Sequence, residues 1–318
     1  MAPITHKQPI GVLAALSSGF DVVTHQLSLV LLPAGLDLVL WLGPRLRASA
    51  LWPLVAFDIP SSLDARTQLF AQQLQDAARQ MFESANWLGW LRPPVFGMPG
   101  LVTGATPAPK GFRLAEWQVG DAPAFFVWIA LLAVIGIGVG GLYWSAIARQ
   151  ARDGRIDWGA AVGRLMSLWP RLLGLAALVV GLAFVVWLPV IVASGLMGMA
   201  FGLVGALLVM LAVSVLIWLL FYLAFSIHGI VLYNQRVLEA VRTSVWLGRT
   251  YFWPTVGILV ALNAIEWGLA LVWSLAPADS WLWLVSIFGN AFVVTGVSMA
   301  TMVFYMDRVP IPHSTFAA

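Results

Sequence analysis

Hydrophobic residues occur in long uninterrupted runs along this chain. The longest lies between Arg171 and Arg236, where residues 172–235 include no Asp, Glu, Lys or Arg. A helix that crosses a bilayer needs about 20 predominantly apolar residues. The run is therefore long enough for two crossings with a turn between them, and it predicts a membrane protein.

Six apolar stretches have the length and pattern of membrane-spanning helices. The first is interrupted by Pro33, which we expect to break its helix. The pattern predicts an all-α polytopic membrane protein with about six transmembrane helices. The six predicted spans are residues 26–43, 123–147, 172–194, 201–227, 254–276 and 281–306.

A long polar segment, residues 58–122, separates the first two spans, and we call it the insertion. Residues 61–91 have the apolar spacing of an amphipathic helix, with Ser61 or Ser62 as the N-cap. We expect this helix to lie on the membrane or to cover the helix bundle. Residues 92–123 are rich in Pro and Gly and predict an irregular loop. The insertion therefore divides the chain into residues 1–57, 58–122 and 123–318, and it is either a covering flap or a docking surface for a partner.

Three short amphipathic segments lead directly into spans one, three and five. Each has the pattern of a helix that lies in the membrane interface. The chain therefore predicts three repeats of an interfacial helix followed by two spans, with the insertion inside the first repeat. The three segments are residues 10–25, 156–169 and 237–252.

Composition supports the membrane assignment and excludes several other classes. The chain is 61% hydrophobic and 10% charged, with a mean hydropathy of +0.90. Its net charge is only +3, and no basic run with interleaved aromatic residues suggests a nucleic-acid partner. Cysteine is absent, which excludes disulfides, thiol catalysis and cysteine-ligated metal sites.

Residues 228–262 resemble a recurring segment of the membrane region of bacterial glycerophosphodiester phosphodiesterase membrane-domain-like proteins. The resemblance lies in a span end followed by an aliphatic pair, then Glu239, Ala240, Ser244, Trp246 and Phe252 at the family's positions. The membrane region of that family is non-catalytic. The resemblance therefore implies a fold rather than phosphodiesterase activity.

Basic residues alternate between the loops and predict the topology. The segments after spans two and four hold several arginines, whereas the turns after spans three and five hold neither Lys nor Arg. Short basic loops stay in the cytoplasm, while long loops translocate largely regardless of charge. With the family resemblance, this predicts a bacterial inner-membrane protein with both termini in the cytoplasm and the insertion outside.

Four polar residues within the predicted spans are candidates for function: Asp37, Asn263, Glu266 and Asn290. An ionised carboxylate at the bilayer centre costs about 2.5–3.5 kcal/mol by insertion scales, and the predicted spans offer no Lys or Arg to pair with Asp37 or Glu266. These two carboxylates are either a proton or cation relay or polar contacts between helices. In the second case Asn263 or Asn290 would supply hydrogen bonds.

Glycine-rich spans predict close helix packing. Gly136, Gly138 and Gly140 superficially resemble a dinucleotide-binding fingerprint, but they lie in an apolar span with no preceding strand. A second group follows a small-residue pattern that favours helix contact. We expect spans two and four to pack tightly, within the chain or against another copy. The second group is Gly195, Gly198 and Gly202.

No catalytic motif, metal-ligand set or cofactor fingerprint occurs in the sequence, and His228, which ends span four, is expected at the membrane interface. The leading hypothesis is a non-enzymatic accessory or scaffold protein that binds membrane lipids, a membrane protein partner or a second copy. The alternative is a small transporter or ion- or proton-coupled permease that uses the intramembrane carboxylates. A membrane-embedded lipid enzyme ranks third, because the sequence offers no polar cluster at one membrane face.

Overall fold

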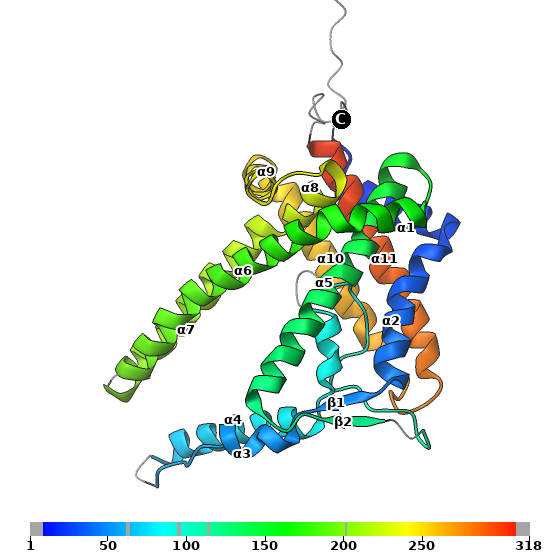
Figure 1. The fold of residues 1–318 in the computed structure, drawn as a ribbon. Coiled ribbons are helices and arrows are strands. Elements are labelled where there is room, and N and C mark those ends of the chain that lie inside the picture. The colour runs from blue at the N-terminus through cyan, green and yellow to red at the C-terminus, as the bar shows by residue number, and fades with distance from the viewer. Residues whose placement is uncertain (1–8, 62–63, 94–96, 113–114, 201, 310–318) are drawn as a thin grey trace, which may run out of the picture. The chain divides into compact units, whose positions relative to one another are not determined.

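The fold is that of an all-α polytopic membrane protein, as predicted. The computed structural model describes residues 9–61, 64–93, 97–112, 115–200 and 202–309. Among these residues, five helical segments are long and apolar enough to cross a membrane (Figure 1). They are α5 (Ala122–Asp153), α6 (Trp158–Ala200), α7 with α8 (Gly202–Leu223 and Ser226–Tyr233), α10 (Phe252–Trp273) and α11 (Trp283–Arg308).

The first predicted span differs from the other five. Helix α1 (Val12–His25) is followed at a 94° bend by the short η1 (Leu27–Val30) and by α2 (Leu31–Leu42). This pair adds a sixth span only if the two bent parts form one crossing. The predicted break at Pro33 is wrong, because Pro33 lies in the first turn of α2, where a backbone N–H has no intrahelical acceptor to lose.

Contacts divide the chain into two compact units. Unit 1 comprises Met1–Val22, Gly141–Asn263 and Gly296–Ala318, and unit 2 comprises Val23–Gly140 and Ala264–Thr295. The insertion therefore belongs to the same unit as α2 and the first half of α5. The division falls within the helices α1, α5, α10 and α11.

Unit 1 is built from helices alone among its described residues. Helix α6 packs along α7, and α9 (Val237–Thr250) contacts α6, α7 and α8. Helix α1 meets α11 at Gly19, where an added Cβ would lie 2.6 Å from the backbone nitrogen of Ala300. A side chain at Gly19 would therefore force these two helices apart. Tyr143, Phe225 and Phe304 are fully buried in the core of this unit.

Unit 2 contains a small parallel ribbon that joins the end of the insertion to the segment between α2 and the insertion. Strand β1 (Arg45–Arg47) pairs with β2 (Glu116–Gln118), with Leu46 opposite Trp117. The predicted irregular loop is wrong over β2, because a three-residue strand is too short for a periodic pattern. Between the strands lie η2 (Ser49–Leu51), α3 (Trp52–Val55), α4 (Ala65–Ser84) and η3 (Trp87–Leu91).

The helix predicted over residues 61–91 is divided at Asn86. The side-chain Oδ1 of Asn86 accepts hydrogen bonds from the N–H of Leu46 (3.0 Å) and of Leu88 (3.2 Å). The N–H of Asn86 donates to the carbonyl of Gly104 (2.7 Å). A short polar side chain that bonds the backbone competes with helix continuation. Helix α4 therefore ends at Ser84, and a new turn begins after Asn86.

The start of α4 also differs from the prediction. Asp64 caps the helix, because its Oδ1 accepts a hydrogen bond from the N–H of Thr67 at 3.1 Å. An N-cap side chain satisfies one of the four unpaired N–H groups of a helix start. The predicted cap at Ser61 is therefore wrong, and Ser62 lies outside the described residues.

Two of the three predicted interfacial helices are separate elements. Helices α1 and α9 precede α2 and α10, as the repeat pattern requires. The middle segment continues without a break into span three, so that both form the single helix α6, with Pro170 inside it. The proposed repeat is therefore visible as a similar order of elements in its first and third copies.

Candidate functional site

The carboxylate of Asp37 is enclosed by groups from the insertion, although Asp37 itself lies on α2. Its side chain is 0% exposed. One oxygen accepts hydrogen bonds from Arg92 Nη1 (2.9 Å) and from the N–H of Val102 (2.8 Å). The other oxygen accepts from the N–H of Leu101 (3.0 Å). We call Asp37, Arg92 and the backbone of residues 101–102 the carboxylate clamp.

Arg92 joins the two sides of this clamp. Its Nη1 also donates to the carbonyl oxygen of Val102 at 3.0 Å. Its guanidinium lies against Gly100, where an added Cβ would approach Nη2 to 2.3 Å. A side chain at position 100 would therefore have to displace the guanidinium from its place in the clamp.

The predicted spans hold no cation for Asp37, but the insertion supplies one, Arg92. Arg92 is separated from Asp37 by 55 residues and lies outside every predicted span. A search confined to the apolar stretches could not find this partner. A buried carboxylate costs much less when it is paired and hydrogen-bonded, so the clamp explains how α2 can hold Asp37.

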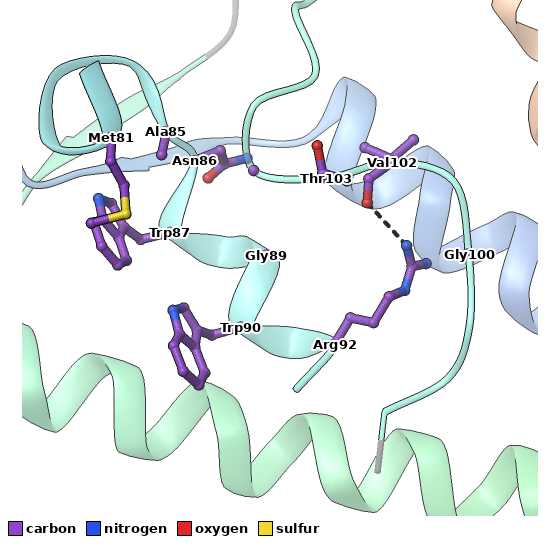
Figure 2. Close-up of a pocket in the computed structure, with 11 residues that line it drawn as sticks. Met81, Ala85, Asn86, Trp87, Gly89, Trp90, Arg92, Gly100, Val102 and Thr103 are labelled. Carbon is purple, nitrogen blue, oxygen red and sulfur yellow. Dashed lines mark hydrogen bonds between the residues drawn. The ribbon is translucent and has the colours of Figure 1, made fainter. Parts of the chain in front are cut away.

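Next to the clamp lies a pocket of about 330 Å³, formed by residues of the insertion (Figure 2). Trp87 and Trp90 project on the same side of η3, and Met81 from α4 is directed toward Trp87. Arg92 reaches in the other direction, toward Val102. The pocket wall is therefore largely aromatic and aliphatic, with the clamp at one end.

Some polar atoms of this wall have no hydrogen-bond partner among the described residues. They are the indole nitrogen of Trp87 and the Nε and Nη2 of Arg92, all of them buried. Most buried polar groups in proteins are paired.

The frame of the pocket is held from three sides. The ring of Trp87 lies edge-on to that of Phe125 in the first turn of α5, at 4.7 Å between centroids. Asn86 ties it to β1 and to Gly104, as described above. Arg45 Nη2 donates to the carbonyl of Thr106 at 3.0 Å.

The charge of Arg45 is kept in this position. Burial and the nearby Arg47 lower the pKa of its guanidinium, and the carboxylate of Glu116 partly opposes this lowering. Arginine nevertheless stays protonated at neutral pH.

The other three polar candidates have simpler surroundings. Asn263 donates to the carbonyl of Leu259 in its own helix at 2.8 Å. Glu266 is exposed on α10, and within the described residues of unit 2 no hydrogen bond joins it or Asn290 to Asp37. The Nδ2 of Asn290 is buried and unpaired among the described residues. Within unit 2, Glu266 and Asn290 therefore do not join Asp37 in one polar cluster.

Of the predicted packing glycines, Gly136 has a defined contact. An added Cβ at Gly136 would lie 2.4 Å from the carbonyl oxygen of Leu91, so this glycine lets the insertion lie directly on α5. Gly138 and Gly140 are buried. The surroundings of Gly195, Gly198 and Gly202 lie outside what the structure describes. Helix α7, from predicted span four, contacts α6 and α9.

A second buried polar group surrounds His228 in unit 1. The sequence predicts His228 at the membrane interface, and the structure shows that its side chain is packed inside the protein, with 3% exposed. Its Nε2 lies 2.8 Å from Thr301 Oγ1, and that hydroxyl donates to the carbonyl of Ser298 at 2.7 Å. Because the Thr301 hydroxyl donates its hydrogen bond to Ser298, it accepts the one from His228, so that Nε2 carries the hydrogen. The opposite ring nitrogen, Nδ1, is therefore an acceptor, and it is unpaired among the described residues.

The residues that carry the family resemblance have structural places in unit 1. Glu239 accepts the N–H of Arg236 at 3.0 Å, at the start of α9. Ser244 donates to the carbonyl of Tyr222 (2.7 Å) and accepts the N–H of Phe225 (3.1 Å). Ser244 therefore supplies hydrogen bonds at the break between α7 and α8. These contacts cap and join helices.

Comparison with known proteins gave no relative. No model of a protein family matches the chain, and neither the curated proteins nor the solved structures contain a match. The family resemblance therefore stays a prediction. Within the described residues, no group of three or more His, Asp or Glu is placed to hold a metal ion.

Proposed function

We propose that this chain is a non-enzymatic integral membrane accessory protein and that its insertion binds a membrane lipid. The observation that carries the proposal is the pocket of about 330 Å³ beside the carboxylate clamp. Small-molecule sites are typically concave, mostly apolar and about 300–1,000 Å³ in volume. Two indoles and a methionine suit an acyl chain, because all three present flexible or flat apolar surface.

The position of the pocket favours a lipid over a soluble ligand. Trp87 in its wall contacts Phe125 in the first turn of α5. The next residues of α5, Phe126 and Val127, are 68% and 67% exposed. Large apolar side chains exposed on a spanning helix face the acyl chains. The pocket therefore lies beside the level at which lipid contact begins.

The clamp favours a binding function over transport. A proton or cation relay needs a carboxylate that can exchange its ligand. Asp37 instead accepts three hydrogen bonds, one of them from a cation. Its arrangement is that of a structural anchor that holds the insertion on α2. The arginine distribution of the loops favours an orientation with both termini in the cytoplasm, and together with the family resemblance it favours a bacterial inner membrane.

The proposal is tested by photolabelling in liposomes that contain a diazirine-bearing phosphatidylcholine. We expect labelled peptides from the pocket wall, and we expect Trp90→Ala to reduce their labelling about tenfold, which corresponds to a loss of about 1.4 kcal/mol of apolar contact. Trp117→Ala is the matched control, because Trp117 is an exposed tryptophan of the same insertion outside the pocket.

Equal labelling of the Trp90→Ala and Trp117→Ala proteins would contradict lipid binding in the pocket. A bifunctional crosslinker in native membranes then tests the competing idea. If a protein is crosslinked to residues 85–104 of the unchanged chain but not to the Trp90→Ala variant, the pocket binds a membrane protein partner rather than a lipid.

A further inference from the structure

Helix α4 carries an apolar face that the other described residues of unit 2 leave exposed. Leu74 and Met81 are 51% and 47% exposed, and Ala77 between them is exposed as well. Their spacing of three and four residues places them on one side of a helix. A soluble surface would seldom leave such a stripe open.

The opposite face of α4 is polar and almost electrically neutral. Asp76, Arg79 and Glu83 follow the same spacing on this side, and Arg79 pairs with Glu83 at 2.8 Å. The helix contains two arginines and two acidic residues in total. Attraction to an anionic surface therefore contributes little, and any binding must come from the apolar face.

The end of α4 lies at the start of a membrane-spanning helix. The ring of Phe82 is 6.2 Å from that of Phe125 and 5.5 Å from that of Trp87. Phe125 is in the first turn of α5, directly before the exposed apolar residues at 126 and 127. In unit 2, α4 runs across this end of α5 (Figure 1). This direction is parallel to the surface of a bilayer that α5 crosses.

We infer that α4 lies in the interface of the leaflet at the N-terminal end of α5, with Leu74, Ala77 and Met81 in the acyl boundary. Amphipathic helices of low net hydrophobicity bind in this way, with the apolar face about 5–10 Å into the boundary between headgroups and acyl chains. The apolar face of α4 is therefore covered by the same bilayer that the spanning helices of this chain cross.

This inference also gives the proposed pocket an entry route. Met81 belongs both to the apolar face of α4 and to the wall of the pocket. An acyl chain beneath α4 would reach the pocket without leaving the leaflet. The placement of α4 rests on the membrane assignment and on no ligand, so that the two proposals fail independently.

The absence of cysteine allows a direct test. Four variants each carry one cysteine. It replaces Leu74 or Ala77 on the apolar face, or Gln72 or Asp76 on the polar face, and the two polar-face variants are the matched controls. Each protein is labelled with the fluorophore NBD and placed in phosphatidylcholine nanodiscs.

We expect a nitroxide on the lipid chain to quench positions 74 and 77 at least threefold more than positions 72 and 76. Iodide in the buffer should show the reverse order. Protection of positions 74 and 77 from iodide without quenching by the lipid nitroxide would overturn the inference, since a second protein surface would then cover the face.

Two further measurements test the inference. In the first, about a third of the phosphatidylcholine is replaced by phosphatidylglycerol. The quenching pattern should stay unchanged, because α4 carries no net charge. A pattern that appears only with anionic lipid would overturn the inference. Trp90→Ala should not alter the pattern, which separates this test from that of the pocket.

Discussion

The chain buries polar side chains in two regions, and the two do so by different means. In unit 2, Asp37 and Arg92 form an ion pair between α2 and the insertion. In unit 1, His228 and Thr301 form a neutral hydrogen bond between α8 and α11. The first contact holds a loop-rich segment in place, whereas the second joins helices that already pack through large apolar side chains.

The difference shows which region depends on its polar contact. Removing one member of a buried ion pair leaves a charge without compensation. Removing one member of a neutral pair leaves only a dipole unpaired, at a cost of about 1–3 kcal/mol. We therefore expect loss of the Asp37–Arg92 ion pair to lower the stability of the protein more than loss of the His228–Thr301 hydrogen bond. Three sets of variants test this order.

The largest effect is expected from Arg92→Ala. It leaves the carboxylate of Asp37 buried without its cation, and the loss of stability should be about 3–5 kcal/mol. Equilibrium unfolding of the purified protein in mixed micelles of increasing denaturing detergent measures this loss. Limited proteolysis should at the same time show new cleavage within residues 85–104.

Arg79→Ala is the control for this variant. Arg79 also pairs with a carboxylate, but the side chains of Arg79 and Glu83 are 59% and 44% exposed. Exposed pairs contribute little, so we expect no measurable change in the unfolding midpoint. Similar losses in both variants would show that the clamp is no stronger than a surface pair.

An intermediate effect is expected from Gly100→Ala. The new Cβ would overlap the guanidinium of Arg92 and displace it from the clamp, at a cost of about 1–3 kcal/mol. Gly35→Ala on α2 is the matched control, because an added Cβ there meets nothing within 4 Å. In a helix this control should be neutral or stabilising, by up to about 1 kcal/mol. The same unfolding assay measures the stability of both variants. An unchanged stability of Gly100→Ala would show that the guanidinium of Arg92 does not lie against residue 100.

The smallest effect is expected at His228. His228→Phe keeps a ring in the core and removes the hydrogen bond to Thr301, with an expected loss of about 1 kcal/mol. Thr301→Val leaves the Nε2–H of His228 buried without an acceptor, so its cost should be larger, toward about 3 kcal/mol. The opposite order would contradict a hydrogen bond donated by His228 Nε2 to Thr301.

Local patterns in the sequence were sufficient to predict most elements and insufficient to predict their polar contacts. Span limits from the apolar runs lie near those of α5, α10 and α11. The division at Asn86 and the cap at Asp64 were missed, because several polar residues near each boundary can bond the backbone equally well from sequence alone. The pocket was not predicted, because its wall combines residues from α4, from η3 and from the loop at residues 100–104, which share no local sequence pattern.

By itself, the sequence determined that this protein lies in a membrane, the presence of five long apolar helices and the amphipathic nature of α4. These properties follow from composition and from spacing over a few residues, because helix periodicity and the thickness of a bilayer act locally. Only the tertiary structure decided that Asp37 is paired with Arg92, that His228 is buried, and that Leu74 and Met81 stay uncovered. Such outcomes depend on which segments, distant in the sequence, come into contact. The partners of a carboxylate or of an apolar helix face therefore cannot be predicted from the residues next to it in the sequence.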